Sequence, residues 1–134
     1  MYNRGILLAQ GGRHQEAVSQ FDKVIAIAPE ISNCYLNRGA SLDELGLHEE
    51  AISSYTRATD LNPTNSFAWF NRARTNYYLS NLNEALTDYS RVLELTPDDA
   101  EAFNNRGLAY DALKDYEKAI KDFDAALELR PYFA

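Results

Sequence analysis

The sequence predicts an all-α fold of tandem helical hairpins, and two observations lead to that prediction. All four prolines recur every 34 residues, and alanines and aromatic residues keep the same step. A fixed period of this length is typical of repeat proteins, in which each unit buries its apolar face against the next. The recurring residues are Pro29, Pro63, Pro97 and Pro131, then Ala17, Ala51, Ala85 and Ala119, then Phe21, Tyr55, Tyr89 and Phe123.

Each unit is interpreted as two helices, as the fourth unit shows. Phe103, Gly107 and Tyr110 fall at helical spacing, and a second apolar series with the same period begins at Tyr116. Asp115 precedes that series and is expected to cap its helix. Each proline follows a second helix, where its missing N–H costs no hydrogen bond. We expect about eight antiparallel helices in repeats at approximately 1–31, 32–65, 66–99 and 100–133.

Turns and small residues give further expectations. Gly46 suits a left-handed helix end in the second unit. Asp98, with Glu101 three residues later, resembles a capping box at a helix start. Small residues on the first helices would let the second helices approach closely. These small residues are Gly5, Gly39, Ala73 and Gly107.

The composition limits the classes of function. A net charge of −7 disfavours nucleic acid as a partner, because phosphates would be repelled. No apolar run approaches the roughly 18 residues of a membrane span, and no secretion leader is visible. The single cysteine, Cys34, is interpreted as packing filler and gives a weak hint of a reducing compartment. We therefore expect a cytoplasmic protein without membrane or nucleic-acid contacts.

No motif for catalysis or cofactor binding is recognisable. The chain has no glycine-rich phosphate loop, no His-Glu-x-x-His and no cysteine pair. His14 and His48 share one repeat position and are interpreted as scaffold, because a metal needs several converging ligands. We therefore expect no enzyme activity, no cofactor and no metal.

An arginine recurs at one position of every first helix, where a partly buried guanidinium would require acceptors. Asp88 and Asp122 follow Arg72 and Arg106 by sixteen residues, so we predict two structural ion pairs, Arg72–Asp88 and Arg106–Asp122. A row of phosphate-binding arginines is the alternative.

The first two units differ at the position sixteen residues after the arginine. Gln20 and Ser54 stand there in place of an acid, so Arg4 and Arg38 are expected to find other acceptors.

The repeat pattern resembles the tetratricopeptide repeat (TPR) over essentially the whole chain. The third unit departs at the tyrosine position, where it has Asn76. The resemblance implies an α-α superhelix, a solenoid of four helix-turn-helix units in one domain, 1–134, that binds other proteins. The residues that carry it are Trp69, Ala73, Ala85, Tyr89 and Pro97 in the third unit, and Phe103, Gly107, Tyr110, Ala119, Phe123, Ala126 and Pro131 in the fourth.

The resemblance also implies a concave groove lined by the first helices, which would receive an extended peptide or a partner helix. The family's chaperone-tail binders hold a carboxylate there with lysine and arginine. The corresponding positions here lack those charges, so no such clamp is expected. These positions hold Tyr2, Ile6, Phe67 and Asn71, or in the next frame Leu36, Ala40, Glu101 and Asn105. The groove residues implied are Tyr2, Asn3, Leu36, Asn37, Phe67, Phe70, Asn71, Arg74, Tyr78, Asn104 and Asn105.

A row of asparagines along the groove is the alternative to the clamp. An amide both donates and accepts, so it can pair with the backbone of an extended peptide. Buried polar groups usually bond internally, however, so the same asparagines could serve only the scaffold. Both interpretations stay open at this point. The row would comprise Asn3, Asn37, Asn71 and Asn105.

Three functions are left by the sequence: an adaptor that uses the groove, a substrate-recruiting or regulatory segment of a larger enzyme, and a self-associating array. The chain starts inside one repeat and Ala134 opens a fifth, so we expect a piece of a longer array. We expect Ile120, Phe123 and Leu127 to be exposed on the last helix and covered by another copy in a homo-oligomer.

Overall fold

The structure is a computed structural model that describes residues 1–131, and within them the chain forms eight α-helices and no strand. The expected all-α fold of helical hairpins is therefore confirmed. The fourth repeat was expected to end at residue 133, and its last two residues lie outside the described part. The helices are α1 (Tyr2–Gln10), α2 (His14–Ile27), α3 (Ser32–Glu44), α4 (His48–Leu61), α5 (Ser66–Tyr78), α6 (Leu82–Leu95), α7 (Ala100–Ala112) and α8 (Tyr116–Leu129).

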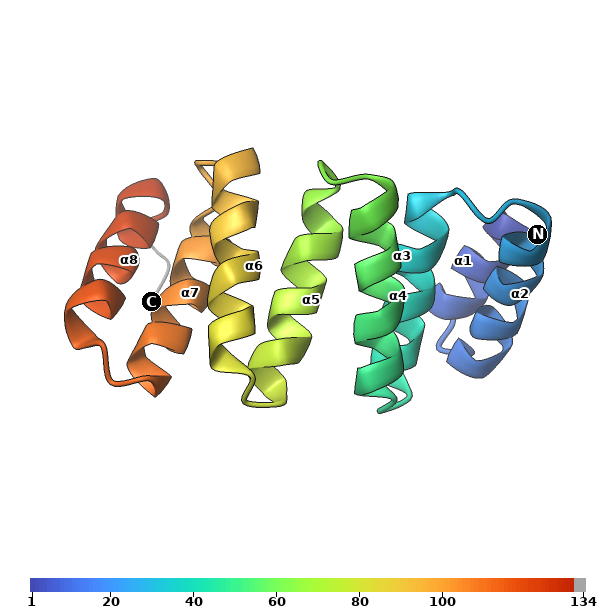
Figure 1. Ribbon diagram of the computed structural model, residues 1–134, viewed down its shortest axis with the longest axis horizontal. Helices are drawn as coiled ribbons and strands as arrows, with labels where there is room; N and C mark the ends of the chain where they lie inside the picture. The colour runs from blue at the N-terminus through green and yellow to red at the C-terminus, as the bar shows by residue number, and fades with distance from the viewer. Residues whose placement is uncertain (132–134) are drawn as a thin grey trace. The chain divides into compact units, whose positions relative to one another are not determined.

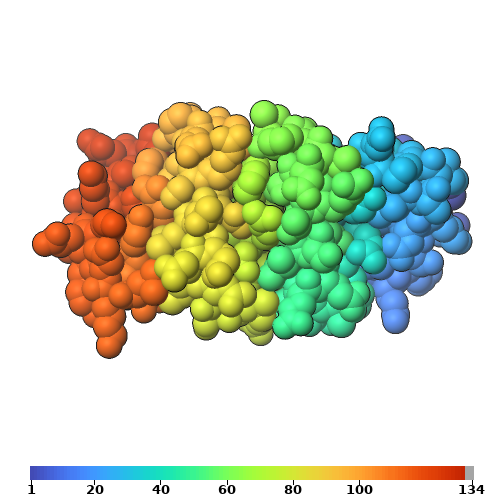
Figure 2. All heavy atoms as spheres, in the orientation of Figure 1, coloured from blue at the N-terminus to red at the C-terminus, as the bar shows by residue number. Residues whose placement is uncertain are grey.

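The chain divides into two compact units, Met1–Asn71 and Arg72–Ala134, and the division falls within α5. In the first unit, α1 packs on α2, α2 on α3 and α3 on α4 (Figure 1). In the second unit, α6 packs on α7 and α7 on α8. Side chains fill the spaces that the ribbons leave open between neighbouring helices of one unit (Figure 2).

Each hairpin turn places one residue in the left-handed region of backbone conformation. Gly46 has φ 78°, as expected from its position after α3. Gly12 has φ 80°, and the equivalent Ser80 and Lys114 both have φ 63°. The backbone of the turn is thus the same in every repeat, although two of the four residues are not glycine.

The two expected helix caps have different outcomes. Asp115 caps α8 as predicted, because its Oδ1 accepts from the Lys118 N–H at 3.4 Å. The capping box at Asp98 is wrong. Helix α7 begins at Ala100, and the capping residue is Asp99, whose Oδ1 accepts from the Ala102 N–H at 3.0 Å.

Each glycine of a first helix lies against an aromatic ring of the second helix, a contact that the repeat period did not predict. A Cβ added at Gly39 would stand 2.5 Å from Cε1 of Tyr55, and one at Gly107 would stand 2.7 Å from Cε1 of Phe123. Phe123 is therefore half-buried inside its own hairpin. The expectation that it is exposed on the last helix is wrong, whereas Ile120 and Leu127 are exposed as expected.

Cys34 packs inside the first unit, in a cluster with Phe21 and Val24. Its Sγ lies 3.6 Å from the Phe21 carbonyl oxygen, to which the thiol donates. Burial raises the pKa of the Cys34 thiol to about 11, with a further contribution from the negative charge of Asp22. The thiol is therefore protonated at neutral pH and serves as packing, as the sequence predicts.

Candidate functional site

The recurring arginines hold helices together. Arg72 donates from Nε and Nη2 to the two carboxylate oxygens of Asp88, at 2.8 and 2.9 Å. Arg106 donates in the same two-pronged way to Asp122, at 2.8 Å for both bonds. Both carboxylates are buried, so the guanidinium supplies the charge that a buried acid needs. Both ion pairs predicted from the sixteen-residue spacing are present.

Arg38 bridges three helices of the first unit. Its Nε donates to Asp22 on α2 at 2.6 Å, and its Nη1 donates to Ser54 on α4 at 2.6 Å. The acceptors thus stand sixteen residues before and sixteen residues after the arginine. Arg106 likewise reaches back sixteen residues to Ser90 Oγ, at 3.2 Å. The acceptor sixteen residues before the arginine was not expected from the sequence. The expectation that Arg38 would not use Ser54 is wrong.

An asparagine network links the first helices of the first unit. The Nδ2 of Asn37 donates to the Tyr2 hydroxyl and to the Asn33 carbonyl oxygen, both at 2.8 Å. Burial raises the pKa of the Tyr2 hydroxyl, and the hydrogen bond from Asn37 opposes that change. No described residue bonds to the Oδ1 of Asn37, so this acceptor remains available to a ligand.

Asn65 extends that network, and sequence reasoning missed it. It is buried in the loop before α5, where its Nδ2 donates to Asn33 Oδ1 at 3.0 Å and to Ser32 Oγ at 3.1 Å. The sequence contained a signal for this residue, because Asn65 occupies the same repeat position, just before a first helix, that Asp99 holds before α7. We call Tyr2, Asn33, Asn37 and Asn65 the amide line.

The other groove residues expected in the first unit differ widely in exposure. Asn3 on α1 is exposed, and Phe67 on α5 is 72% exposed. Leu36 is partly buried against the cluster of Leu42, Ala51 and Tyr55. Phe70 and Asn71 are half-buried.

In the second unit, several of the expected residues surround the hydroxyl of Tyr89. Burial raises the pKa of this hydroxyl, while a hydrogen bond from Asn105 and the charge of Arg74 oppose the shift. The charge of Glu101 and the hydroxyl of Tyr77 raise it further. Polar and charged side chains of α5 and α7 therefore act electrostatically on one hydroxyl of α6.

Two more of the expected residues belong to the second unit. Tyr78 is 71% exposed at the end of α5, and Asn104 is half-buried on α7 beside Asn105. Because Asn37 and Asn105 both bond within the fold, a scaffold role for them has direct support. The same bonds fix the direction of each amide group.

The histidines lie apart from these residues. His48 Nδ1 is 2.9 Å from Asp43 Oδ1, and Asp43 Oδ2 accepts from the Tyr55 hydroxyl at 2.7 Å. Among residues 1–131, no group of three or more histidine, cysteine or acidic side chains is arranged to hold a metal ion. No helix in that range is long and apolar enough to cross a membrane.

Models of one protein family match along the chain. A model described as tetratricopeptide repeat matches 32–65 and 100–133, which together make up half of the chain. Two others with that description match 1–31 and 54–87, and one described as TPR repeat matches 73–114. No curated protein matches the sequence.

Solved structures with the same fold include MamA and YrrB. A crystal structure of MamA superposes with a TM-score of 0.92 at 24% identity, over 96% of this chain and 75% of that one. MamA from Desulfovibrio magneticus RS-1 superposes with a TM-score of 0.90 at 22% identity, and the match covers 99% of this chain and 76% of that one. YrrB is described as a TPR protein with an unusual peptide-binding site. It superposes with a TM-score of 0.90 at 27% identity, and the match covers 98% of this chain and 68% of that one. The helical hairpins, their 34-residue period and these matches together establish that the chain belongs to the tetratricopeptide repeat family.

Proposed function

We propose that the chain is a protein-interaction scaffold that binds an extended segment of a partner protein along its first helices. The observation that carries this proposal is the amide line of the first unit. Internal hydrogen bonds hold its amide groups in place, and some of their donor and acceptor atoms stay available to a ligand. Membership of the TPR family supports an interaction role. The peptide-binding site named for YrrB, at 27% identity, supports a peptide as the partner.

The spacing of atoms on α3 suits an extended peptide. Asn37 retains its Oδ1 as an acceptor, and no described residue takes the Nδ2 donor of Asn33. The two residues stand four apart on one helix, so their side chains are about 5–6 Å apart. Alternate residues of an extended strand are separated by about 6.6 Å. One amide can therefore bind an N–H of the peptide and the other a C=O two residues away.

Side-chain selectivity would come from the residues around these amides. Phe67 offers an exposed apolar ring in the first unit, and Tyr78 offers one in the second. Arg74 and Glu101 place both signs of charge near Tyr89. The second unit therefore favours a partner segment with an apolar anchor and mixed charges, held in the micromolar range, near −8 kcal/mol.

A peptide-display selection followed by affinity measurement tests this function. Peptides selected on the wild-type chain are titrated against Asn37→Ala/Asn71→Ala/Asn105→Ala, with fluorescence anisotropy as the readout. We expect a loss of at least about tenfold in affinity, because hydrogen bonds are lost on a desolvated surface. Arg13→Ala, an exposed change on the loop before α2, serves as the control and should bind normally. Unchanged binding by the triple variant would move the site to another face.

Self-association is a second candidate function. Tyr116, Ile120 and Leu127 on α8 are 57%, 58% and 43% exposed, so three large side chains of one helix face solvent. We propose that another copy covers this helix. Sedimentation equilibrium at several concentrations should then show mass above the monomer, and Ile120→Lys/Leu127→Lys should return it to the monomer. A wild-type monomer throughout the range would contradict the proposal.

A further inference from the structure

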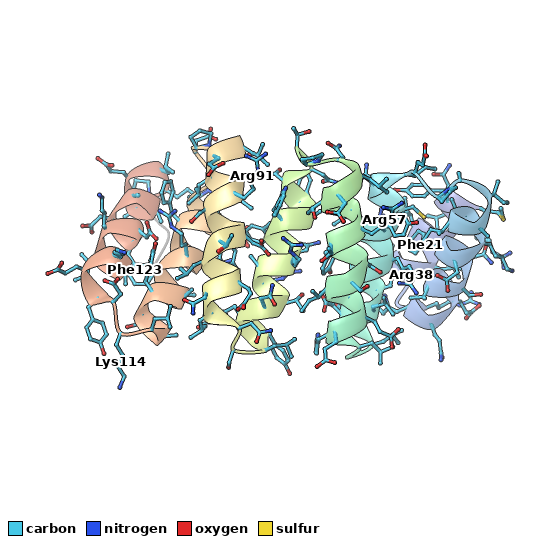
Figure 3. The ribbon with its side chains drawn as sticks, viewed as in Figure 1. Phe21, Arg38, Arg57, Arg91, Lys114 and Phe123 are labelled. Atoms are coloured by element: carbon cyan, nitrogen blue, oxygen red, sulfur yellow. The ribbon has the colours of Figure 1, made fainter. Side chains whose placement is uncertain are left out.

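A small pocket on the α3–α4 hairpin is separate from the amide line. Its lining comes from Tyr35 and Arg38 on α3 and from Ser53, Ser54 and Arg57 on α4, around a volume of about 260 Å³. Sites for drug-sized ligands occupy about 300–1,000 Å³, so this pocket suits a single functional group. Arg38 and Arg57 both lie between the ribbons of α4 and α2 in Figure 3.

The two guanidinium groups have donors to spare. Arg57 makes no ion pair with any described residue, and it sits over the ring of Tyr35 with 5.9 Å from Cζ to the ring centroid. The Tyr35 hydroxyl donates to the Pro29 carbonyl oxygen at 3.1 Å, which fixes that ring as a wall of the pocket. Arg38 uses Nε and Nη1 for Asp22 and Ser54. Its Nη2 hydrogens are left for a ligand, because a guanidinium has five N–H donors.

The serines add hydroxyl donors, and no carboxylate lines the pocket. Ser54 Oγ accepts from Arg38, so its own hydrogen can still be donated. Ser53 is exposed beside it. The charge of Arg38 is offset by Asp22 at 2.6 Å, so Arg57 supplies the net positive charge. Donors from two arginines and two serines thus face a space without an acceptor of equal strength.

The next repeat shows what distinguishes this pocket. The position of Ser54 is there occupied by Asp88, a buried acid that would repel an anion. The position of Arg57 is occupied by Arg91, whose Nη1 is 2.8 Å from Glu94 Oε2. At the place of Glu94, the second repeat has aspartate, which is one methylene shorter. The second repeat therefore lacks the repelling acid, and its Asp60 forms no ion pair with Arg57.

We propose that this pocket binds a tetrahedral oxyanion, and specifically a phosphate group. Guanidinium groups pair with phosphate through parallel N–H···O bonds, and bonds to an ionised oxygen are the strong ones. The donors come from two helices and several directions, which suits four oxygens better than the flat pair of a carboxylate. The phosphate is carried on a side chain of a partner protein or is free in solution. The proposal is independent of peptide binding on the first helices.

Phosphate titrations of the full chain test this inference. Inorganic phosphate, a phosphoserine peptide and acetate are added at constant ionic strength, and backbone amide NMR shifts are followed. We expect saturable shifts for phosphate around α3 and α4 in the millimolar range. Arg57→Gln should weaken phosphate binding by at least about tenfold. Arg91→Gln is the matched control, since its guanidinium is already paired, and should bind as wild type.

A second variant keeps the test independent of folding. Ser54→Asp places in the pocket the acid that the later repeats have, so phosphate binding should be lost while the unfolding temperature is kept or raised. Tighter binding of the phosphopeptide than of inorganic phosphate supports a partner side chain as the source, and equal binding supports free phosphate. The proposal is overturned if Arg57→Gln binds phosphate like wild type, if acetate binds as tightly, or if wild type shows no saturable shift.

Discussion

Replacing Arg106 by methionine is the sharpest test of how the repeats are held together. The side chain of Asp122 is only 5% exposed, and Arg106 donates to both of its oxygens at 2.8 Å. Methionine fills a similar volume but leaves this carboxylate buried without its counter-charge. Breaking a buried ion pair from one side costs about 3–5 kcal/mol. At roughly 3 °C per kcal/mol for a chain of this length, the unfolding temperature should fall by about 10–15 °C.

Two companion variants separate the charge from the packing. Arg106→Met/Asp122→Leu removes both partners, and much of the stability should return because well-packed apolar pairs replace buried ion pairs at little cost. Arg38→Met should cost only about 1 kcal/mol, since its acid, Asp22, is 53% exposed and stays hydrated.

Urea unfolding followed by circular dichroism at 222 nm, together with thermal scans, gives these free energies. A loss below about 1 kcal/mol for Arg106→Met, or one no larger than for Arg38→Met, would refute the reasoning. If the double variant does not regain stability, the loss in Arg106→Met does not come from the unpaired buried charge of Asp122. The ion pair itself then stabilises the fold.

Three further predictions concern the first unit. Gly39→Val should destabilise by about 1–3 kcal/mol in urea unfolding, because even a Cβ there stands 2.5 Å from the Tyr55 ring, whereas Gly11→Ala should cost less. Asp43→Ala removes an acceptor of the Tyr55 hydroxyl and should cost about 1 kcal/mol, with a smaller effect in a Tyr55→Phe background. Native Cys34 should react with iodoacetamide at pH 8 at least about 100-fold more slowly than the unfolded chain, because its pKa is raised from 9.0 to about 11. Since the folded thiol keeps its proton longer, its contribution to stability is constant below pH 9 and is lost as the pH rises toward 11.

The candidate binding residues could be predicted only in part. The repeat phase predicts that Asn37 and Asn105 lie on first helices, but their partners depend on other elements. Asn105 finds the hydroxyl of Tyr89, sixteen residues before it. Asn37 has Phe21 at that position and uses the Tyr2 hydroxyl instead. Because Phe21 on α2 has no hydroxyl, the hydroxyl of Tyr2 on α1 accepts the hydrogen bond of Asn37 instead. No local sequence pattern predicts this exchange.

The sequence by itself determined the helical hairpins, their order, and the two buried ion pairs. Period, proline position and small residues are local signals, and an offset of sixteen residues within one hairpin gives the same ion pair in both repeats that carry the acid. Only the tertiary structure decided the contacts between successive hairpins. Asp22 reaches Arg38, and Asn65 completes the amide line, because packing brings side chains of successive hairpins together. For the same reason, the pocket at Arg57 could not be seen in the chain, since a cavity exists only where two packed helices leave space.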